Sequence, residues 1–323
     1  MRYLSFLLLF LAFRISPLSA QDNGSTLQNR PSTLKDTSIL RTETLKKAPA
    51  PDTDSTPPVP SHLQLNLQYQ SNDVSNGRAD SSVIPLVTPQ VSYIFKSGLE
   101  FDLSISYNVY DRSPQVNEYT LDALYSFNPG NYSNTVTLSG FLYNKQSGSV
   151  TAEQKGSLEI DNSYQLPFIT IGADFTWTFA STPDYQISPS LQQEFDFLKN
   201  GNLSLTPTVT MNAATQNTYS AYYKNRRFSI PRSGKPPIPE VLNISGEVLN
   251  SGKFQILDYE FSAPVNWAAG KWSLNFTPTY ALPVNPADVK ITLELNDHTV
   301  KNYTYREILP NRFYWQLGVT YDF

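Results

Sequence analysis

Acidic side chains recur on one side of an alternating polar and apolar pattern, and they are the residues of this sequence best suited to chemistry. Between Leu99 and Leu103, for example, Glu100 and Asp102 alternate with apolar residues. The full set is Glu100, Asp102, Glu118, Asp122, Glu159, Asp161, Asp174, Glu194, Asp196, Asp258, Glu260 and Asp322. Carboxylates that line a water-filled path favour cations. The set predicts such a path, except for those members that lie at solvated rims.

The histidines are the other candidates for chemistry. The sequence has two, His62 and His298, and His298 follows Asp297 with Glu294 nearby. An acid–base mechanism would use such a pair, but one Asp-His step in a loop more often marks a solvent-exposed turn. The sequence has no recognisable zinc-protease, phosphate-loop or nucleophile-elbow motif. We therefore expect no enzymatic activity, no bound metal and no cofactor.

The elements that position the carboxylates are predicted to be β-strands. Side chains alternate between the two faces of a strand, so apolar residues at every second position indicate one apolar and one polar face. Twelve stretches show this alternation: 63–69, 87–95, 99–109, 119–127, 136–142, 158–164, 169–179, 185–191, 203–211, 257–265, 272–280 and 313–323. The segment 241–249 could add further strand, so fourteen strands remain an alternative.

The last strand carries a resemblance to a known class of proteins. Phe313, Trp315, Leu317, Val319, Tyr321 and Phe323 alternate with polar or small residues. This ending resembles the closing strand of bacterial outer-membrane β-barrels, without assignment to a particular family. The resemblance implies that the barrel-assembly machinery reads Phe323 as an assembly signal. It also implies an antiparallel up-and-down barrel of about twelve strands, with both termini in the periplasm.

The lengths of the connections support the barrel interpretation. Short links follow the even-numbered strands, at 96–98, 128–131, 165–167, 199–202 and 268–270. Longer links follow most odd-numbered strands, at 71–82, 110–117, 145–156, 214–252 and 283–311. Only 181–183 departs from this rule. Short turns on one side and long loops on the other are typical of outer-membrane barrels, in which the short side is periplasmic.

The N-terminal region predicts export followed by a flexible connection. Residues 1–20 contain a basic start, a short apolar run and small residues near Ala20, a layout typical of a signal peptide. Residues 21–60 are rich in Pro, Ser and Thr, which predicts a disordered periplasmic tether. Residues 61–323 are expected to form the barrel. Because the sequence has no cysteine, we expect neither disulfides nor a lipid-modified cysteine.

The loop at 214–252 is basic, whereas the inferred lumen is acidic. Its bases are Lys224, Arg226, Arg227, Arg232 and Lys235, followed by a proline-rich run. Three interpretations are open: the loop narrows the lumen, it contacts lipopolysaccharide phosphates, or it is an ordinary exposed loop. The net charge of −4 argues against nucleic-acid binding.

Together these features predict a narrow porin-like channel for small hydrophilic solutes. Its expected partners are outer-membrane lipids, lipopolysaccharide and the assembly machinery. An alternative is an outer-membrane anchor whose basic loop binds surface polysaccharide or a protein. The sequence leaves the solute and the oligomeric state open.

Overall fold

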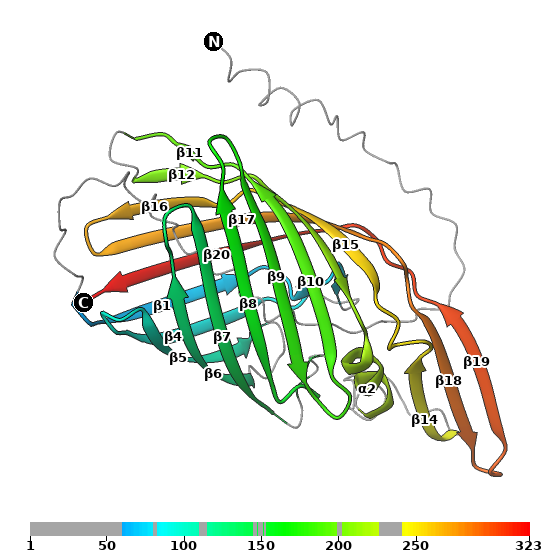
Figure 1. The fold of residues 1–323 in the computed structure, drawn as a ribbon. Coiled ribbons are helices and arrows are strands. Elements are labelled where there is room, and N and C mark those ends of the chain that lie inside the picture. Colours follow the sequence, from blue (N-terminus) through cyan, green and yellow to red (C-terminus); the bar gives the residue numbers. More distant parts are fainter. Residues whose placement is uncertain are drawn as a thin grey trace. The chain divides into compact units, whose positions relative to one another are not determined.

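A computed structural model describes residues 60–79, 83–109, 115–144, 147, 151, 153–198, 202–225 and 241–323. Within these residues, one antiparallel sheet closes on itself into a ring of twelve strands (Figure 1). The strands of the ring are β1 (His62–Gln70), β4 (Leu86–Ile94), β5 (Leu99–Asn108), β6 (Gln115–Phe127), β7 (Tyr132–Tyr143), β8 (Gly156–Gln165), β9 (Thr170–Phe179), β10 (Asp184–Gln192), β13 (Thr208–Ala214), β15 (Gln255–Ser262), β17 (Trp272–Pro283) and β20 (Arg312–Asp322). The predicted up-and-down barrel of about twelve strands is therefore confirmed.

The last strand closes the ring on both of its sides. Strand β20 pairs with β1, with Leu65 opposite Tyr321, and with β17, with Leu274 opposite Val319. Every predicted alternating stretch coincides with a ring strand or with its short continuation. Three such continuations, β11 (Phe195–Asp196), β12 (Leu203–Leu205) and β16 (Val265–Ala269), extend β10, β13 and β15 toward the short turns.

The prolines within the strands coincide with interruptions of the hydrogen-bonded ladder. Thr206-Pro207 separates β12 from β13, and Ala263-Pro264 separates β15 from β16. Pro89 keeps its partner on β1, but the paired residues of β4 and β5 skip positions 88 and 89. Proline lacks the N–H that the hydrogen-bonded ladder needs, so at each of these sites the strand loses its pairing on one side.

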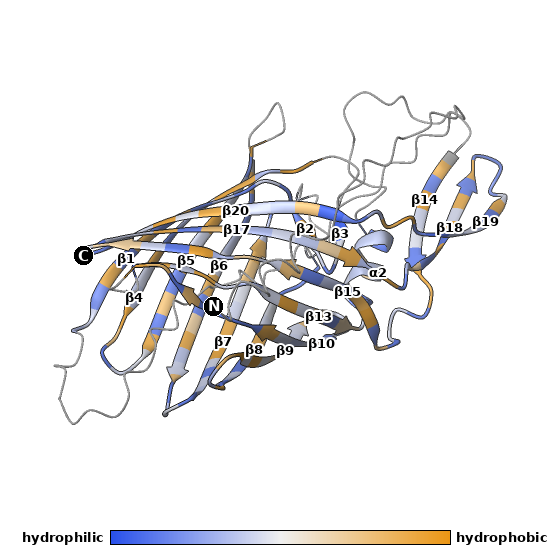
Figure 2. Ribbon diagram, turned by 90° about the horizontal axis from the view of Figure 1, so that it is seen from above, coloured by the Kyte–Doolittle hydropathy of each residue, from blue (hydrophilic) through white to orange (hydrophobic). Residues whose placement is uncertain are grey.

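Polar and apolar residues alternate along the strands of the ring, as the colours of Figure 2 show, and many of the apolar side chains are exposed. On β5, Phe101 and Leu103 are about half exposed, whereas Asp102 and Ser104 are buried. A closed barrel has no other sheet to cover its outer face. The exposed apolar side chains therefore form a belt on the outside of the ring. Such a belt is far larger than the apolar patches of soluble proteins and matches the lipid-facing band of membrane barrels.

Aromatic side chains border the apolar belt at both ends. Next to the short turns, the exposed aromatic residues are Tyr93, Phe95, Phe101, Tyr125, Phe127, Tyr132, Tyr164, Phe168, Phe197, Trp267, Trp272 and Phe323. At the other end they are Tyr119, Trp177, Tyr185, Tyr280 and Phe313. Amphipathic rings favour the membrane–water boundary, and two such girdles are characteristic of outer-membrane barrels.

The connections sort by length as predicted, and we call the two ends of the barrel the short-turn end and the long-loop end. Three features occupy the long-loop end: the hairpin of β2 (Val74–Ser75) with β3 (Arg78–Ala79), the helix α2 (Asn217–Asn225), and a separate sheet. This sheet has the order β14 (Val241–Val248), β18 (Asp288–Leu295) and β19 (Val300–Arg306). The segment 241–249 therefore forms strand outside the ring, and the fourteen-stranded alternative is wrong.

Packing between these features is local. Beneath α2, the buried side chains of Tyr219, Tyr222 and Tyr223 pack against Val248 and Val289. This cluster fixes the helix to the base of the separate sheet. In the part of the chain that the structure describes, no helix is long and apolar enough to cross a membrane.

Candidate functional site

The loop that follows β1 turns into the barrel instead of away from it. Residues Val74–Ala79 form the two-stranded β2–β3 hairpin, which we call the inward hairpin. Its turn consists of Asn76 and Gly77, with φ of 47° and 71°. Two consecutive residues with positive φ define the tight type I′ turn, for which Asn-Gly is the preferred sequence. The local sequence therefore explains the hairpin.

The inward hairpin reaches strands far around the ring. The Asn76 Nδ2 donates to Gln186 Oε1 at 3.2 Å on β10, which is five places from β1 by way of β20, β17, β15 and β13. Val74 packs with Ala281 of β17 and Tyr314 of β20 in a small buried cluster. The hairpin therefore crosses the interior of the barrel at the long-loop end.

The tip of the inward hairpin fits closely against the wall. A Cβ atom at Gly77 would lie 2.8 Å from Pro283 Cβ and 2.9 Å from Asp258 Cβ. Real Cβ atoms almost never come this close to another atom. Only glycine satisfies both the positive φ and this space.

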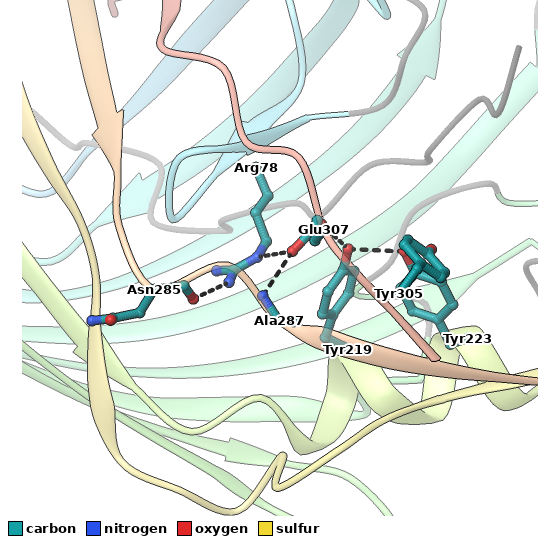
Figure 3. A network of polar contacts seen from close by, with 7 residues as sticks. All are labelled: Arg78, Tyr219, Tyr223, Asn285, Ala287, Tyr305 and Glu307. Atoms are coloured by element: carbon teal, nitrogen blue, oxygen red, sulfur yellow. Dashed lines mark hydrogen bonds and ion pairs between the residues drawn. The ribbon is translucent and has the colours of Figure 1, made fainter. Parts of the chain in front are cut away.

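A buried ion pair fastens the base of the hairpin, as Figure 3 shows. Arg78 Nε donates to Glu307 Oε2 at 3.3 Å, and Nη2 donates to the Asn285 carbonyl oxygen at 3.5 Å. The Arg78 guanidinium also lies over the Tyr219 ring, 5.6 Å from its centre. The Arg78 and Glu307 side chains are only 2% and 6% exposed. Burial of a charge is tolerated only when such partners compensate it.

Tyr219 connects the ion pair to α2. Its hydroxyl donates to Glu307 Oε1 at 2.5 Å, and the Tyr223 hydroxyl lies 3.3 Å from it. Burial, with a further contribution from the Glu307 carboxylate, raises the pKa of the Tyr219 hydroxyl well above its ordinary value. The hydroxyl therefore stays protonated and remains a donor. Hairpin, helix and the segment after β19 form one connected polar network.

Helix α2 is held at its first turn by a carboxylate from the wall. Asp184 Oδ1 accepts from the Asn217 backbone N–H, and Oδ2 accepts from the Thr218 N–H, both at 2.7 Å. A carboxylate at this position satisfies the free N–H groups of the helix and complements its dipole. The helix start is thus docked directly on β10.

A polar cavity lies between the inward hairpin, the start of α2 and strands β8, β9 and β10. Its empty space, counted together with the space open to solvent, is about 690 Å³. The hairpin contributes Ser75, Asn76 and Arg78, and the wall contributes Ser, Thr and Gln side chains together with Glu159 and Asp184. This cavity is the part of the interior where the loop elements and the barrel wall meet.

The carboxylates that are predicted to line the lumen differ in how deeply their side chains are buried. Asp102, Asp122 and Asp258 are buried on the polar side of the wall, and Asp102 lies opposite Asp122 on neighbouring strands. Glu100, Glu159, Asp161, Asp174 and Glu260 are partly buried, and Asp161 lies opposite Asp174. Glu260 accepts a hydrogen bond from the Tyr314 hydroxyl at 3.1 Å. Glu194 is exposed beside the break between β10 and β11, and its predicted place in the lumen stays a prediction.

The basic loop is only partly described. Lys224 is exposed near the end of α2. Arg226, Arg227, Arg232 and Lys235 lie outside the described residues. Among the described parts of the loops, it is 71–79 that folds across the interior, a segment that sequence reasoning did not single out. The Asn76-Gly77 step was the available signal.

Each of the two histidines lies beside a carboxylate. The His298 side chain is 78% exposed in the β18–β19 turn, with Nδ1 3.2 Å from Glu294 Oε1, as expected for a solvated turn. His62 Nε2 lies 3.8 Å from Asp322 Oδ1 beside the closing strand. Among the described residues, no group of three or more His, Asp or Glu side chains could hold a metal ion. The absence of enzymatic activity stays a prediction.

The closed antiparallel ring, outward apolar belt and polar interior decide the fold class. The fold is that of a porin-like outer-membrane β-barrel. No family model matches the chain, and no curated protein matches it. Similar solved structures include the NanC porin, with 8% identity, TM-score 0.39, and coverage of 80% of this chain and 98% of that chain.

Two further similar solved structures come from named bacteria. LpxR from Salmonella typhimurium is 7% identical with a TM-score of 0.41, over 80% of this chain and 100% of that one. The outer membrane protein Omp33 of Acinetobacter baumannii is 8% identical with a TM-score of 0.30, over 83% and 100%. Likeness at this level carries no statement about what this barrel does.

Proposed function

We propose that this protein is an outer-membrane channel for small hydrophilic solutes, narrowed by the inward hairpin. The observation that carries the proposal is the hairpin, which occupies the polar interior of a closed, lipid-compatible ring. Eight-stranded barrels are filled by their own side chains, whereas sixteen or more strands leave a wide aqueous channel. Twelve strands lie between these limits, and an inserted hairpin reduces the width further.

The orientation that we propose follows from the loop sorting. The short turns and both termini lie in the periplasm, and the long loops with α2 face outward. The ring strands are 9 to 13 residues long, apart from the interrupted ones, which suffices for a tilted crossing of the hydrocarbon core. The inward hairpin then lies at the outer mouth, where a solute would first meet it.

We further propose that the lumen favours cations. Asp102, Asp122 and Asp258 are buried on the polar side of the wall, and Asp161 and Asp174 lie side by side on neighbouring strands. Arg78, the buried basic side chain of the inward hairpin, is already paired with Glu307. Carboxylates along a path attract cations and repel anions, so a path lined by these residues favours cations.

A disulfide that fixes the hairpin tip tests the proposal. Because the sequence has no cysteine, Gly77→Cys with Pro283→Cys would introduce a single pair. The Cβ atoms would have to separate from 2.8 Å to the roughly 3.8 Å of a disulfide, a small movement of the tip. In planar bilayers we expect the oxidised protein to show lower conductance or rarer openings than the reduced protein, with K⁺ preferred over Cl⁻.

The control is Gly77→Cys alone, which cannot form the bond and should not respond to oxidant. Equal conductance of the oxidised and reduced double variants would overturn the role of the hairpin as a constriction. The absence of conductance steps from the wild-type protein and from both redox states would overturn the channel itself.

A second candidate function, an anchor that binds an external partner, is favoured by the separate sheet. Every residue of β19 is exposed, including Tyr303 and Tyr305, and Leu242 of β14 is exposed as well. Tyrosines on an exposed sheet are suited to contacts with a protein or a polysaccharide. If the barrel conducts nothing in the bilayer experiment, this function becomes the better one.

A further inference from the structure

Several residues that line the cavity beside the inward hairpin carry a buried polar atom with no hydrogen-bond partner among the described residues. These atoms are Arg78 Nη1, Gln216 Oε1 and Thr218 Oγ1, and all three residues line the cavity. The residues are 2%, 5% and 2% exposed. Asn76 Oδ1, on the hairpin turn, is a fourth such atom at the same cavity.

Their convergence on one cavity is informative because each carries a cost. A buried donor or acceptor that lacks a partner costs about 1–3 kcal/mol, so native structures rarely tolerate several. These atoms come from the hairpin, the residue that precedes α2 and the first turn of α2. Groups from separate elements that converge unsatisfied on one space are a common sign of a ligand site.

The chemistry of the lining indicates an uncharged ligand. Three charged side chains line the cavity. Arg78 is neutralised by Glu307 at 3.3 Å, Asp184 is occupied at the start of α2, and Glu159 also has a partner in the protein. Serine and threonine hydroxyls and carboxamides make up most of the remaining surface. The unpartnered atoms include a donor, Arg78 Nη1, two acceptor oxygens and a hydroxyl that can do both. A molecule with several hydroxyl groups offers donors and acceptors in the same mixture.

We propose that this cavity binds a small, uncharged, polyhydroxylated solute of the monosaccharide class. Arg78 Nη1 donates to a ligand oxygen, Gln216 Oε1 accepts from a ligand hydroxyl, and the Thr218 hydroxyl does either. The proposal rests on the proposed channel only for the route by which the solute arrives. The proposed lumen as a whole favours cations. The site at the constriction adds a preference for an uncharged solute.

Binding at this site is coupled to the position of the hairpin. Asn76 and Arg78 belong to the inward hairpin, whereas Gln216 and Thr218 belong to the outer loop and helix. A ligand that contacts both sides stabilises the arrangement in which they face each other. The solute therefore holds the hairpin in its inward position while it is bound.

The test is calorimetric titration of the full-length protein in detergent micelles with glucose as the uncharged probe. Glucuronate and glucosamine are matched anionic and cationic probes of the same ring size. We expect glucose to bind more tightly than either charged probe. Thr218→Val keeps the shape but removes the hydroxyl, and Gln216→Met removes the amide, so each should weaken glucose binding by about tenfold.

Thr135→Val is the matched control, because Thr135 is also buried on the polar side of the wall but does not line the cavity. It should leave glucose binding unchanged, and the heat-modifiable mobility of all variants on gels reports whether the barrel is folded. No binding of glucose by the folded wild type, or equal affinity in Thr218→Val and Thr135→Val, would overturn the site. Tighter binding of a charged probe would overturn the substrate class.

Bilayer recordings with and without glucose separate this inference from the channel. Glucose binding without conductance would overturn the channel and keep the site. Conductance that glucose neither blocks nor alters, together with no heat of binding, would overturn the site and keep the channel.

Discussion

Arg78 and Gly77 show how single residues hold the inward hairpin in place. Arg78 brings a charge into the interior, where its pairing with Glu307, the Asn285 carbonyl and the Tyr219 ring compensates the loss of water. Because this set of partners is specific, displacement of the hairpin would leave charges unpaired. Gly77 contributes differently, since it is the lack of a side chain that lets the tip approach the wall.

Substitution of Gly77 is predicted to displace the hairpin tip. Gly77→Ala adds a Cβ that meets Pro283 and Asp258, and overpacking of this kind costs about 1–3 kcal/mol. The positive φ adds about 1–2 kcal/mol. We expect larger or more frequent conductance steps in planar bilayers, with the barrel still folded.

Gly130→Ala is the matched control for the hairpin tip. Gly130 also has a positive φ, of 63°, but nothing lies within 4 Å of its added Cβ. Gly130→Ala should lose only the free energy that the positive φ costs, and it should leave conductance unchanged. If the two variants conduct alike, the close packing of Gly77 does not restrict the channel.

Among the elements, α2 and the inward hairpin are loop structures that the wall fixes in place. The hairpin has a local turn signal, but its inward direction depends on contacts with β10, β15 and β17. Helix α2 has nine residues, fewer than an isolated helix in water needs. Its stability therefore comes from the buried tyrosines and from Asp184.

Removal of the helix cap is predicted to loosen α2 without opening the barrel. Asp184→Ala deletes the acceptor of two backbone N–H groups, a loss of about 0.5–2 kcal/mol. Hydrogen exchange of residues 217–225 should become about tenfold faster, because 1.4 kcal/mol corresponds to a factor of ten.

The control for the helix cap is Asp196→Ala on β11, where the aspartate is exposed. It removes the same charge but should not change exchange in α2. Unchanged protection of α2 in Asp184→Ala would show that the tyrosine cluster alone holds the helix.

At the scale of the whole molecule, closure of the ring leaves the barrel without a free edge. The edge of β20 pairs with both β1 and β17, and the Phe323 backbone N–H donates to the Leu63 carbonyl at 3.0 Å. Every backbone group within the hydrocarbon needs such a partner, because lipid offers none. Phe323 therefore belongs to the seam, and the sequence also predicts that it is an assembly signal.

These two roles of Phe323 are predicted to separate in a substitution. Phe323→Ala keeps the backbone hydrogen bond but removes the ring, so we expect several-fold less assembled barrel in cells. The thermal unfolding of protein refolded in detergent should shift by only a few degrees. Phe313→Ala, on the same strand and 63% exposed against 56% for Phe323, should assemble normally. Equal assembly of the two variants would contradict the signal.

The strand pattern could be predicted because it is local. Alternation of side chains is a property of each strand, and a membrane barrel requires it in every strand. The twelve stretches, their phase and the even count followed from that requirement. The same phase predicted Asp102, Asp122 and Asp258 on the polar face, where they are buried, and their place along a path stays a prediction.

What only the tertiary structure decided is where the loops lie. Arg78 and Glu307 are 229 positions apart, and no periodicity relates them. A loop has no required face, so its direction depends on partners that meet only after the ring closes. The sequence by itself determined the wall and its two faces. The folded chain determined the inward hairpin and the cavity, because these depend on contacts across the closed barrel.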